Sequence, residues 1–331
     1  MKVIIDRAIP FIEGVLEPYA QVEYLDGSNI DHDVVKECDA MIIRTRTRCD
    51  AKLLEGSKVR LIATATIGTD HIDTKYCFEH GIIVANAHGC NARGVLQWMA
   101  AVLKDITSRD HRTPEEYTLG IVGVGSVGSL VKQYAEAWGF KVMACDPPKA
   151  KYLDEVFFSI EELARECDII TLHTPLDRST HHLISRDIIA MMKPEATIIN
   201  ASRGAVADNR AVFDSSHRYY FDVWENEPEM ELDILQRATI ATPHIAGYSQ
   251  QGKANATSMV IRAISSFFGF PLGGWYPSNI PPSAPREIAW NELCSTIDRY
   301  CPISEISQQL KSTPSEFEKM RNNYNYREEY F

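Results

Sequence analysis

A glycine-rich segment between a strand and a helix constrains the fold of this chain more than any other feature. The run Thr118–Val122 has the composition of a β-strand, and Gly123, Gly125 and Gly128 follow it in a Gly-x-Gly-x-x-Gly arrangement. In such a segment the first glycine allows a tight turn, the second lets a pyrophosphate approach the backbone, and the third lets helix and strand pack closely. The motif therefore predicts a Rossmann-type domain that binds a dinucleotide at the N-terminus of the following helix.

An acidic residue at the next strand end indicates which dinucleotide is bound. The strand Lys141–Cys145 ends at Asp146, which is 18 residues beyond Gly128. A carboxylate at this spacing accepts hydrogen bonds from ribose hydroxyls and repels a 2′-phosphate, so we expect NAD rather than NADP. The alternative is a glycine turn in an unrelated fold followed by a surface aspartate, and the flanking strands disfavour it.

Short β-branched runs alternate with helical patterns along the chain, which is typical of α/β proteins with parallel sheets. In the first part of the chain these patterns predict a smaller, flavodoxin-like substrate domain. Its expected strands are Val3–Ile5, Ala40–Ile43, Leu61–Thr64 and Ile82–Ala85, and its expected helices are Ala51–Leu54 and His71–Phe78. After a long helix at about 94–108, the Rossmann-type domain is expected to continue with strands at Ile169–Leu172, Thr197–Asn200, Tyr219–Val223 and Thr239–Ala241.

The length of 331 residues predicts two or three domains. We expect a substrate-binding domain over 1–93, completed by a helix at 250–268, and an NAD-binding domain over 94–248. A proline- and glycine-rich stretch then opens the region 269–331, which we expect to mediate dimerisation.

Composition argues against several other classes of protein. A net charge of −11 disfavours a nucleic-acid partner, which normally requires a basic excess. No run reaches the roughly 18 apolar residues of a membrane span, and the charged N-terminus does not fit a signal peptide. The eight cysteines lack Cys-x-x-Cys spacing and are not grouped with histidines, so we expect free thiols, a cytoplasmic location and no metal. The adjacent His181 and His182 are not expected to form a metal pair, since neighbours on a helix do not face one another.

Three polar residues follow later strands of the Rossmann-type domain and suit hydride chemistry. Arg203, Glu227 and His244 each come after such a strand, and ligands of open α/β sheets gather beyond the strands' carboxyl ends. Loss of hydride from C2 of a hydroxy acid requires a base for the hydroxyl proton, which His244 can supply. Glu227 would orient its imidazole, and Arg203 would bind the substrate carboxylate and polarise the developing carbonyl. The alternatives are a structural salt bridge for Arg203 and a hydrogen-bonded core histidine for His244.

A basic cluster indicates that the substrate carries a second anion. Arg44, Arg46 and Arg48 follow the strand Ala40–Ile43. Alternate residues of an extended chain point the same way, so the three arginines could share a face and bind a phosphate, with Arg44 facing the substrate. The alternative is a solvated charged edge.

At these motifs the chain resembles the D-isomer-specific 2-hydroxyacid dehydrogenase family over roughly its first 270 residues. The resemblance lies in Gly120–Gly128, His173–Leu176, Asn200–Gly204, Asp222–Pro228 and Pro243–Gly247. It implies that Arg203, Glu227 and His244 are catalytic, with His244 the proton shuttle. It also implies NAD contacts at Asp146, Thr174, Asp222 and Gly247, and substrate contacts at Thr45, Thr66 and Tyr248.

Further stretches narrow the resemblance to a group that acts on a small phosphorylated D-2-hydroxy acid. They are Ala63–His71, Gly89–Ala92, Cys145–Pro148, His244–Tyr248 and the tail Phe317–Phe331. The chain departs from the pattern at Thr45, where serine is usual, and at His88 and Gln97, where proline and glutamate are frequent. Its C-terminal region is also shorter than the dimerisation region that is usual in the group.

Two other functions remain open on the sequence alone. The same three catalytic residues would serve a dehydrogenase of 3-phosphoglycerate or of an unphosphorylated acid, although the arginine cluster disfavours the latter. An NAD-sensing binding protein, such as a corepressor built on the same fold, would bind the cofactor with negligible turnover.

Overall fold

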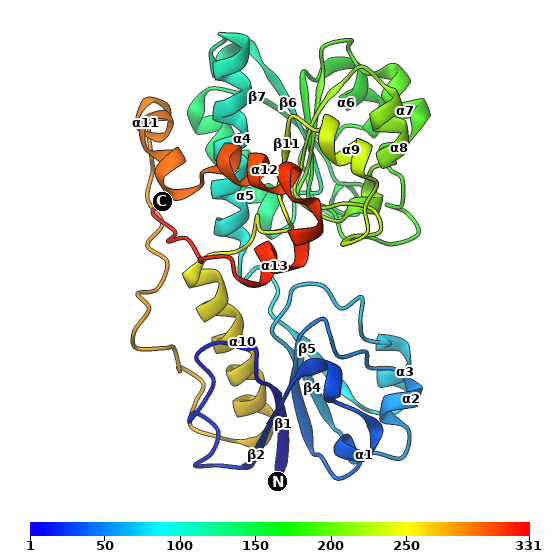
Figure 1. The fold of residues 1–331 in the computed structure, drawn as a ribbon, viewed down its shortest axis with the longest axis vertical. Helices are drawn as coiled ribbons and strands as arrows, with labels where there is room; N and C mark the ends of the chain where they lie inside the picture. Colours follow the sequence, from blue (N-terminus) through cyan, green and yellow to red (C-terminus); the bar gives the residue numbers. More distant parts are fainter. The chain divides into compact units, whose positions relative to one another are not determined.

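The computed structural model describes residues 1–331 and divides into two compact units, each built on a parallel β-sheet (Figure 1). The first unit comprises Met1–Asn91 and Gln250–Ser283, and the second comprises Ala92–Ser249 and Ala284–Phe331. The predicted α/β class is confirmed. Residues 284–331, for which we expected a separate region, pack within the second unit.

The first unit has a five-stranded sheet in the order β2-β1-β3-β4-β5, which is the flavodoxin-like order. Its strands are β1 (Lys2–Asp6), β2 (Gln21–Leu25), β3 (Ala40–Ile43), β4 (Leu61–Thr64) and β5 (Ile83–Asn86). Every residue of β3 and β4 is buried, as expected for central parallel strands covered on both faces. The edge strand β2 escaped the sequence analysis because its segment QVEYL mixes polar and apolar residues and is only partly buried.

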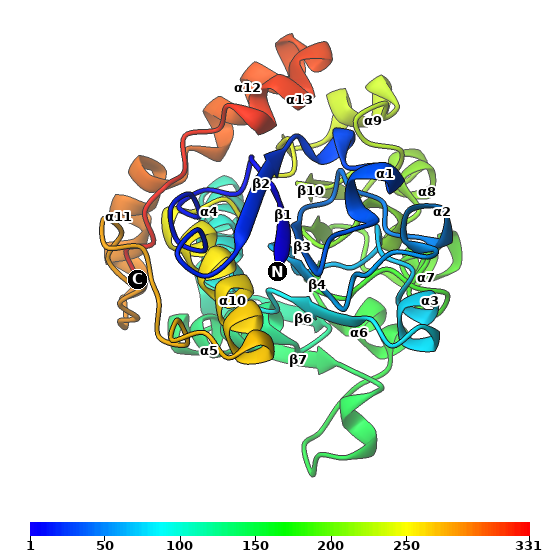
Figure 2. The same cartoon turned by 90° about the horizontal axis from the view of Figure 1, so that it is seen from below.

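Helices cover both faces of this sheet. The long helix α10 (Gln250–Phe268) packs Val260, Ile261 and Ile264 against one face. The short helices α1 (His32–Val35), α2 (Ala51–Leu54) and α3 (Thr74–Glu79) cover the other, and Figure 2 shows the sheet between them and α10. Helix α3 begins three residues later than expected because the Asp73 carboxylate caps it, accepting a hydrogen bond from the Tyr76 amide (2.9 Å).

The second unit has a six-stranded parallel sheet in the order β11-β10-β9-β8-β6-β7. Its strands are β6 (Thr118–Val122), β7 (Lys141–Cys145), β8 (Ile169–Leu172), β9 (Thr197–Asn200), β10 (Arg218–Phe221) and β11 (Ile240–Ala241). The chain leaves β6 toward β7 on one side and returns to β8 on the other. Ligands of open α/β sheets bind at such a reversal, beyond the carboxyl ends of the strands. The topology thus predicts that a ligand binds next to the end of β6, where the glycine motif begins.

Two apolar layers enclose the second sheet. One includes α4 (Ala92–Asp110), α5 (Ser126–Trp138) and α11 (Trp290–Tyr300), with Trp98 and Trp138 among its buried side chains. The other includes α6 (Ile160–Glu166), α7 (Arg186–Met191), α8 (Asn209–Asp214), α9 (Leu232–Arg237), α12 (Ile303–Ser312) and α13 (Phe317–Asn322). Short 3₁₀ turns occur at Gly27–Asn29, Pro114–Glu116, Lys149–Lys151, Gly204–Val206 and Pro314–Glu316. None of the helices combines the length and apolarity that a membrane span requires.

The C-terminal tail fastens the loop that follows β11. The buried guanidinium of Arg327 donates hydrogen bonds to the carbonyls of Gly94 (2.7 Å) and Ile245 (3.1 Å), and also to that of Ala246. Nearby, Ser249 forms a β-bridge with Arg327. One buried side chain therefore joins α4, the tail and the loop after β11.

Arg327→Met is expected to lower the free energy of unfolding by about 3 kcal/mol, because it leaves several buried carbonyls without a donor. Urea unfolding measures the change. The control is Arg299→Met on the exposed side of α11, for which we expect a change within about 0.5 kcal/mol. Equal effects of the two substitutions would contradict the anchoring role of Arg327.

Candidate active site

The glycine motif forms a turn that leaves room for a ligand. Gly123 has a φ of +86°, and a Cβ there would lie 2.8 Å from the carbonyl oxygen of His173. A Cβ on Gly128 would lie 1.9 Å from the carbonyl oxygen of Gly123, so no side chain fits. A Cβ on Gly125, by contrast, would meet nothing within 4 Å. The first and third glycines are thus required by packing, and the second borders open space at the N-terminus of α5, where a phosphate is stabilised by backbone amides.

Asp146 lies directly against this turn. Its carboxylate accepts hydrogen bonds from the backbone amides of Val124 (2.8 Å) and Lys149 (3.0 Å). A carboxylate has about four acceptor positions, so two bonds do not exhaust it. The structure therefore brings the predicted ribose-binding residue to the glycine turn.

The hydroxyl of Thr174 is buried and has no hydrogen-bond partner. Thr174 follows β8, and its methyl group would lie 2.8 Å from a Cβ on Gly123, so it borders the same turn. A buried polar group without a partner is costly, and in native proteins it usually has a ligand or a water. The orphaned hydroxyl, the open space at Gly125 and the carboxylate of Asp146 together fit NAD, whose pyrophosphate and ribose need these groups.

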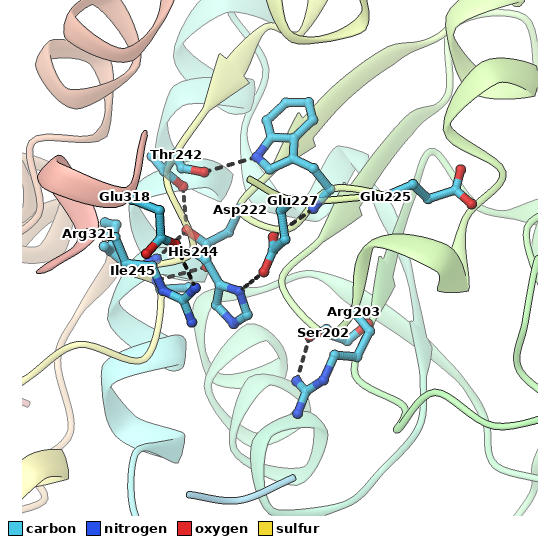
Figure 3. Close-up of polar contacts among 12 residues, drawn as sticks. Ser202, Arg203, Asp222, Glu225, Glu227, Thr242, His244, Ile245, Glu318 and Arg321 are labelled. Atoms are coloured by element: carbon cyan, nitrogen blue, oxygen red, sulfur yellow. Dashed lines mark hydrogen bonds and ion pairs between the residues drawn. The ribbon is translucent and has the colours of Figure 1, made fainter. Parts of the chain in front are cut away.

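Beyond the carboxyl ends of β10 and β11, Glu227 and His244 form a hydrogen-bonded pair (Figure 3). Oε1 of Glu227 contacts Nδ1 of His244, and Oε2 accepts a hydrogen bond from the amide of Trp224 (3.1 Å). Because Nδ1 is held by the carboxylate, Nε2 is the nitrogen that can meet a substrate. This is the geometry of an oriented acid–base histidine.

Glu227 is largely removed from solvent, with a side chain 20% exposed, yet its carboxyl stays ionised. Burial raises the pKa of its carboxyl, but the hydrogen bond to His244 and the positive charges of His244 and Arg321 outweigh burial and hold the pKa below the usual value. A carboxylate in this state can stabilise a protonated imidazole beside it.

Asp222 holds the loop that carries His244. Its side chain is 1% exposed and accepts hydrogen bonds from the Thr242 hydroxyl (2.6 Å) and from the amides of Ile245 (2.8 Å) and Ala246 (2.9 Å). The backbone carbonyl of Asp222 also accepts from the amide of His244 (2.8 Å), whose φ is +56°. Sequence reasoning missed this anchoring role, because no local pattern shows which amides a strand-end aspartate will reach. Its implied contact with NAD stays a prediction.

Arg203 follows β9 in a loop that packs directly on the loop of Glu227. A Cβ on the next residue, Gly204, would lie 2.0 Å from the backbone carbon of Trp224. The Arg203 guanidinium donates to the carbonyl of Ser202 (2.8 Å), and Figure 3 shows it on the same side of the sheet as His244. The structure thus places Arg203 in a loop that contacts the loop of Glu227, and Glu227 contacts His244.

Tyr248 and Gly247 end the loop after β11. The Tyr248 hydroxyl accepts a hydrogen bond from Nε of Arg321 (3.3 Å). Arg321 belongs to α13, and sequence reasoning did not place it in the site. The backbone of Gly247 lies against Gly94, where an added Cβ would be 3.2 Å from its carbonyl. The substrate and NAD contacts implied for Tyr248 and Gly247 stay predictions.

In the first unit, Arg44, Arg46 and Arg48 do not form the shared face that was predicted. Residues 44–47 make a turn closed by the Thr47 amide and the Arg44 carbonyl (3.3 Å), so the argument from an extended chain is wrong. Arg44 donates to the carbonyl of Ala8 (3.0 Å), and Arg48 pairs with Asp50 (3.1 Å).

The threonines of this unit differ in their surroundings. Thr45 is exposed. The Thr66 hydroxyl lies 2.7 Å from that of Thr64 and donates to the carbonyl of Gly68 (2.9 Å). Contacts of Arg44, Thr45 and Thr66 with a substrate stay predictions.

His181, His182 and Glu225 have the donor types of a metal site. We dismissed the histidine pair on the assumption of a helix, which is wrong, because both residues lie in a turn with their rings stacked at 4.1 Å. Their donor atoms and those of Glu225 lie within 4.8 Å of one another. The carboxylate of Glu225 also has structural partners, His182 Nε2 (2.7 Å) and the amide of Asn209 (3.0 Å).

Comparison with known proteins agrees with this geometry. Residues 92–246 match the family model described as D-isomer specific 2-hydroxyacid dehydrogenase, NAD binding domain. The chain is 42% identical to erythronate-4-phosphate dehydrogenase of Bacteroides thetaiotaomicron, with 99% of this chain and 97% of the relative covered. It is 36% identical to the enzyme of the same name from Porphyromonas gingivalis, with 98% and 92% covered.

Solved structures give the same fold. A D-lactate dehydrogenase from Aquifex aeolicus, complexed with NAD and lactic acid, has a TM-score of 0.68 at 26% identity, over 86% of this chain and 100% of its own. An NAD⁺-bound 3-phosphoglycerate dehydrogenase in Entamoeba histolytica has a TM-score of 0.69 at 26% identity, over 81% and 95%. The chain therefore belongs to the D-isomer-specific 2-hydroxyacid dehydrogenase family, as an NAD-dependent oxidoreductase of its erythronate-4-phosphate dehydrogenase group.

Proposed function

We propose that this chain oxidises 4-phospho-D-erythronate to 2-oxo-3-hydroxy-4-phosphobutanoate with NAD, a step of pyridoxal phosphate (vitamin B6) biosynthesis. The observation that carries the reaction type is the Glu227–His244 pair beside a dinucleotide turn. The choice of substrate is supported by relatives named erythronate-4-phosphate dehydrogenase that match nearly the whole chain.

In this proposal His244 moves the proton. Nε2 of His244 takes the proton of the C2 hydroxyl, and the carboxylate of Glu227 on Nδ1 stabilises the imidazolium that forms. Bound at the glycine turn, NAD would supply the acceptor for the hydride of C2. The oxygen of C2 then becomes a carbonyl, and the proton on His244 passes to solvent after the product leaves.

Arg203 is proposed to bind the substrate carboxylate. A guanidinium can donate two parallel hydrogen bonds to a carboxylate, which fixes C2 relative to His244. The loop contact between Gly204 and Trp224 supports this role, because it ties the position of Arg203 to the loop that carries Glu227.

We propose the remaining site residues on the contacts and the family resemblance described above. The NAD contacts are Gly123, Gly125, Gly128, Asp146, Thr174, Asp222 and Gly247, and the substrate contacts are Arg44, Thr45, Thr66 and Tyr248. We also propose a homodimer formed through the region 269–331, on the family resemblance. A cytoplasmic location is supported by the eight free cysteines, seven of them buried, which suit a reducing compartment.

The proposed reaction is tested by following NADH absorbance with 4-phospho-D-erythronate, 3-phosphoglycerate and D-lactate. We expect the highest kcat/KM with 4-phospho-D-erythronate. A preference for another of these acids would overturn the substrate while keeping the reaction type. Binding of NAD without turnover on any of them would favour an NAD-sensing protein instead.

Arg203→Ala is expected to lower kcat roughly 100-fold or more, because the developing charge loses a donor. Steady-state kinetics measure this, and NAD affinity by calorimetry should change little. Near-normal turnover of the variant would remove Arg203 from the mechanism.

Asp146→Ala is expected to lower the ratio of kcat/KM for NAD over NADP by roughly tenfold or more, because the charge that repels a 2′-phosphate is lost. Since Asp146 also accepts a bond from the Val124 amide, Asp146→Asn serves as the matched variant that keeps an acceptor and removes only the charge. An unchanged ratio in both variants would assign the discrimination to another residue.

A further inference from the structure

We propose that Arg321 binds the phosphate group of the substrate, so that the C-terminal segment completes the anion-binding site of the enzyme. This inference rests on the proposed function, since it requires a substrate with a second anion. It assigns a binding role to a residue of α13, a helix of the second unit that follows the strands and loops bearing the three catalytic residues.

Helical spacing explains why an arginine points inward here. Phe317 is 1% exposed within the apolar layer that includes Leu310, and Met320 packs against the same layer. Residues at i, i+3 and i+4 share one face of a helix, so Phe317 and Met320 bring Arg321 to the inner side of α13. The side chain of Arg321 is accordingly only 23% exposed.

The guanidinium of Arg321 lies in the active site. Its Nε donates to the hydroxyl of Tyr248 (3.3 Å), and its positive charge lowers the pKa of the catalytic Glu227. In the view of Figure 3 the guanidinium lies next to the ring of His244, on the side away from Glu227. Arg321 is therefore a second arginine at this site, in addition to Arg203.

The protein stabilises this charge, because the burial of Arg321 is outweighed by its interactions with Tyr248, Glu227 and Glu318, which raise its pKa. The carboxylate nearest to the guanidinium is that of Glu318, at 3.5 Å, and the Glu318 side chain is 42% exposed. A charge removed from water is costly unless it is paired closely and hydrogen-bonded. A guanidinium has five N–H donors. With one phenol and one carboxylate as its partners, Arg321 retains donors for an anion that arrives with the ligand.

The proposed substrate supplies such an anion. It carries a carboxylate on C1 and a phosphate on C4, and the carboxylate is assigned to Arg203. The sequence suggested the cluster Arg44, Arg46 and Arg48 for the phosphate, but the face that they were expected to share does not form. The planar fork of Arg321 matches phosphate oxygens well. In Figure 3 the ring of His244 lies between the guanidinium groups of Arg203 and Arg321, as expected for a C2 atom flanked by two anions.

Arg321→Gln tests the inference when kcat/KM is measured with both 4-phospho-D-erythronate and unphosphorylated D-erythronate. Loss of charge-assisted hydrogen bonds should lower kcat/KM for the phosphorylated acid about 10- to 100-fold, mainly through KM. The value for D-erythronate should change less than about threefold. Arg321→Lys should recover part of the lost preference, because it restores the charge without the fork.

The exposed Arg299→Gln is the matched control, since it removes one positive charge from the same C-terminal region. It should leave both values unchanged, and NAD affinity should be unchanged in every variant. An equal loss with both acids would overturn the inference and make Arg321 a residue that positions Glu227 and Tyr248. A wild-type enzyme without preference for the phosphorylated acid would instead refute the proposed function.

Discussion

The structure of the active site depends on the carboxylate of Asp222, which holds the loop after β11 in one conformation. Three donors of that loop, from Thr242, Ile245 and Ala246, converge on this single buried side chain. They fix His244 in a left-handed backbone conformation that most residues avoid. The strain is acceptable because the surrounding bonds determine the geometry, and the result is an imidazole turned toward Glu227. The position of the Glu227–His244 pair is thus a consequence of the hydrogen bonds that the carboxylate of Asp222 accepts.

Steric requirements determine the conformation of the glycine turn that is proposed to bind the cofactor. At Gly123 and Gly128 the chain passes too close to itself to accommodate a side chain. Because glycine occupies both positions, helix α5 can begin shortly after β6 ends. Gly125 and the unpaired hydroxyl of Thr174 then border the same opening. The glycines that packing requires thus lie beside the residues proposed to contact the dinucleotide.

Much of the fold could be predicted because central parallel strands are buried on both faces and appear as unbroken apolar runs. The limits of the central strands β3, β4, β6, β8 and β9 agree with the predicted ones, as do those of the edge strand β7. The edge strand β2 could not be found in this way, since its partly exposed residues carry no such run.

The positions of Arg203, Glu227 and His244 after the ends of strands could be predicted from residue type and strand pattern, and their catalytic roles stay predictions. The turn at 44–47 and the inward direction of Arg321 depend on tertiary contacts. A pattern of residues along the chain does not reveal such contacts, so neither feature could be predicted.

The role of the Glu227–His244 pair is tested most directly by the single-turnover rate of NADH formation in Glu227→Gln, with enzyme in excess over 4-phospho-D-erythronate. The amide keeps the shape of the side chain but cannot stabilise a protonated imidazole. The account predicts a rate roughly 100-fold or more below that of the wild type, with NAD binding intact. A rate within about threefold of the wild type would contradict the claim that this pair performs the proton transfer.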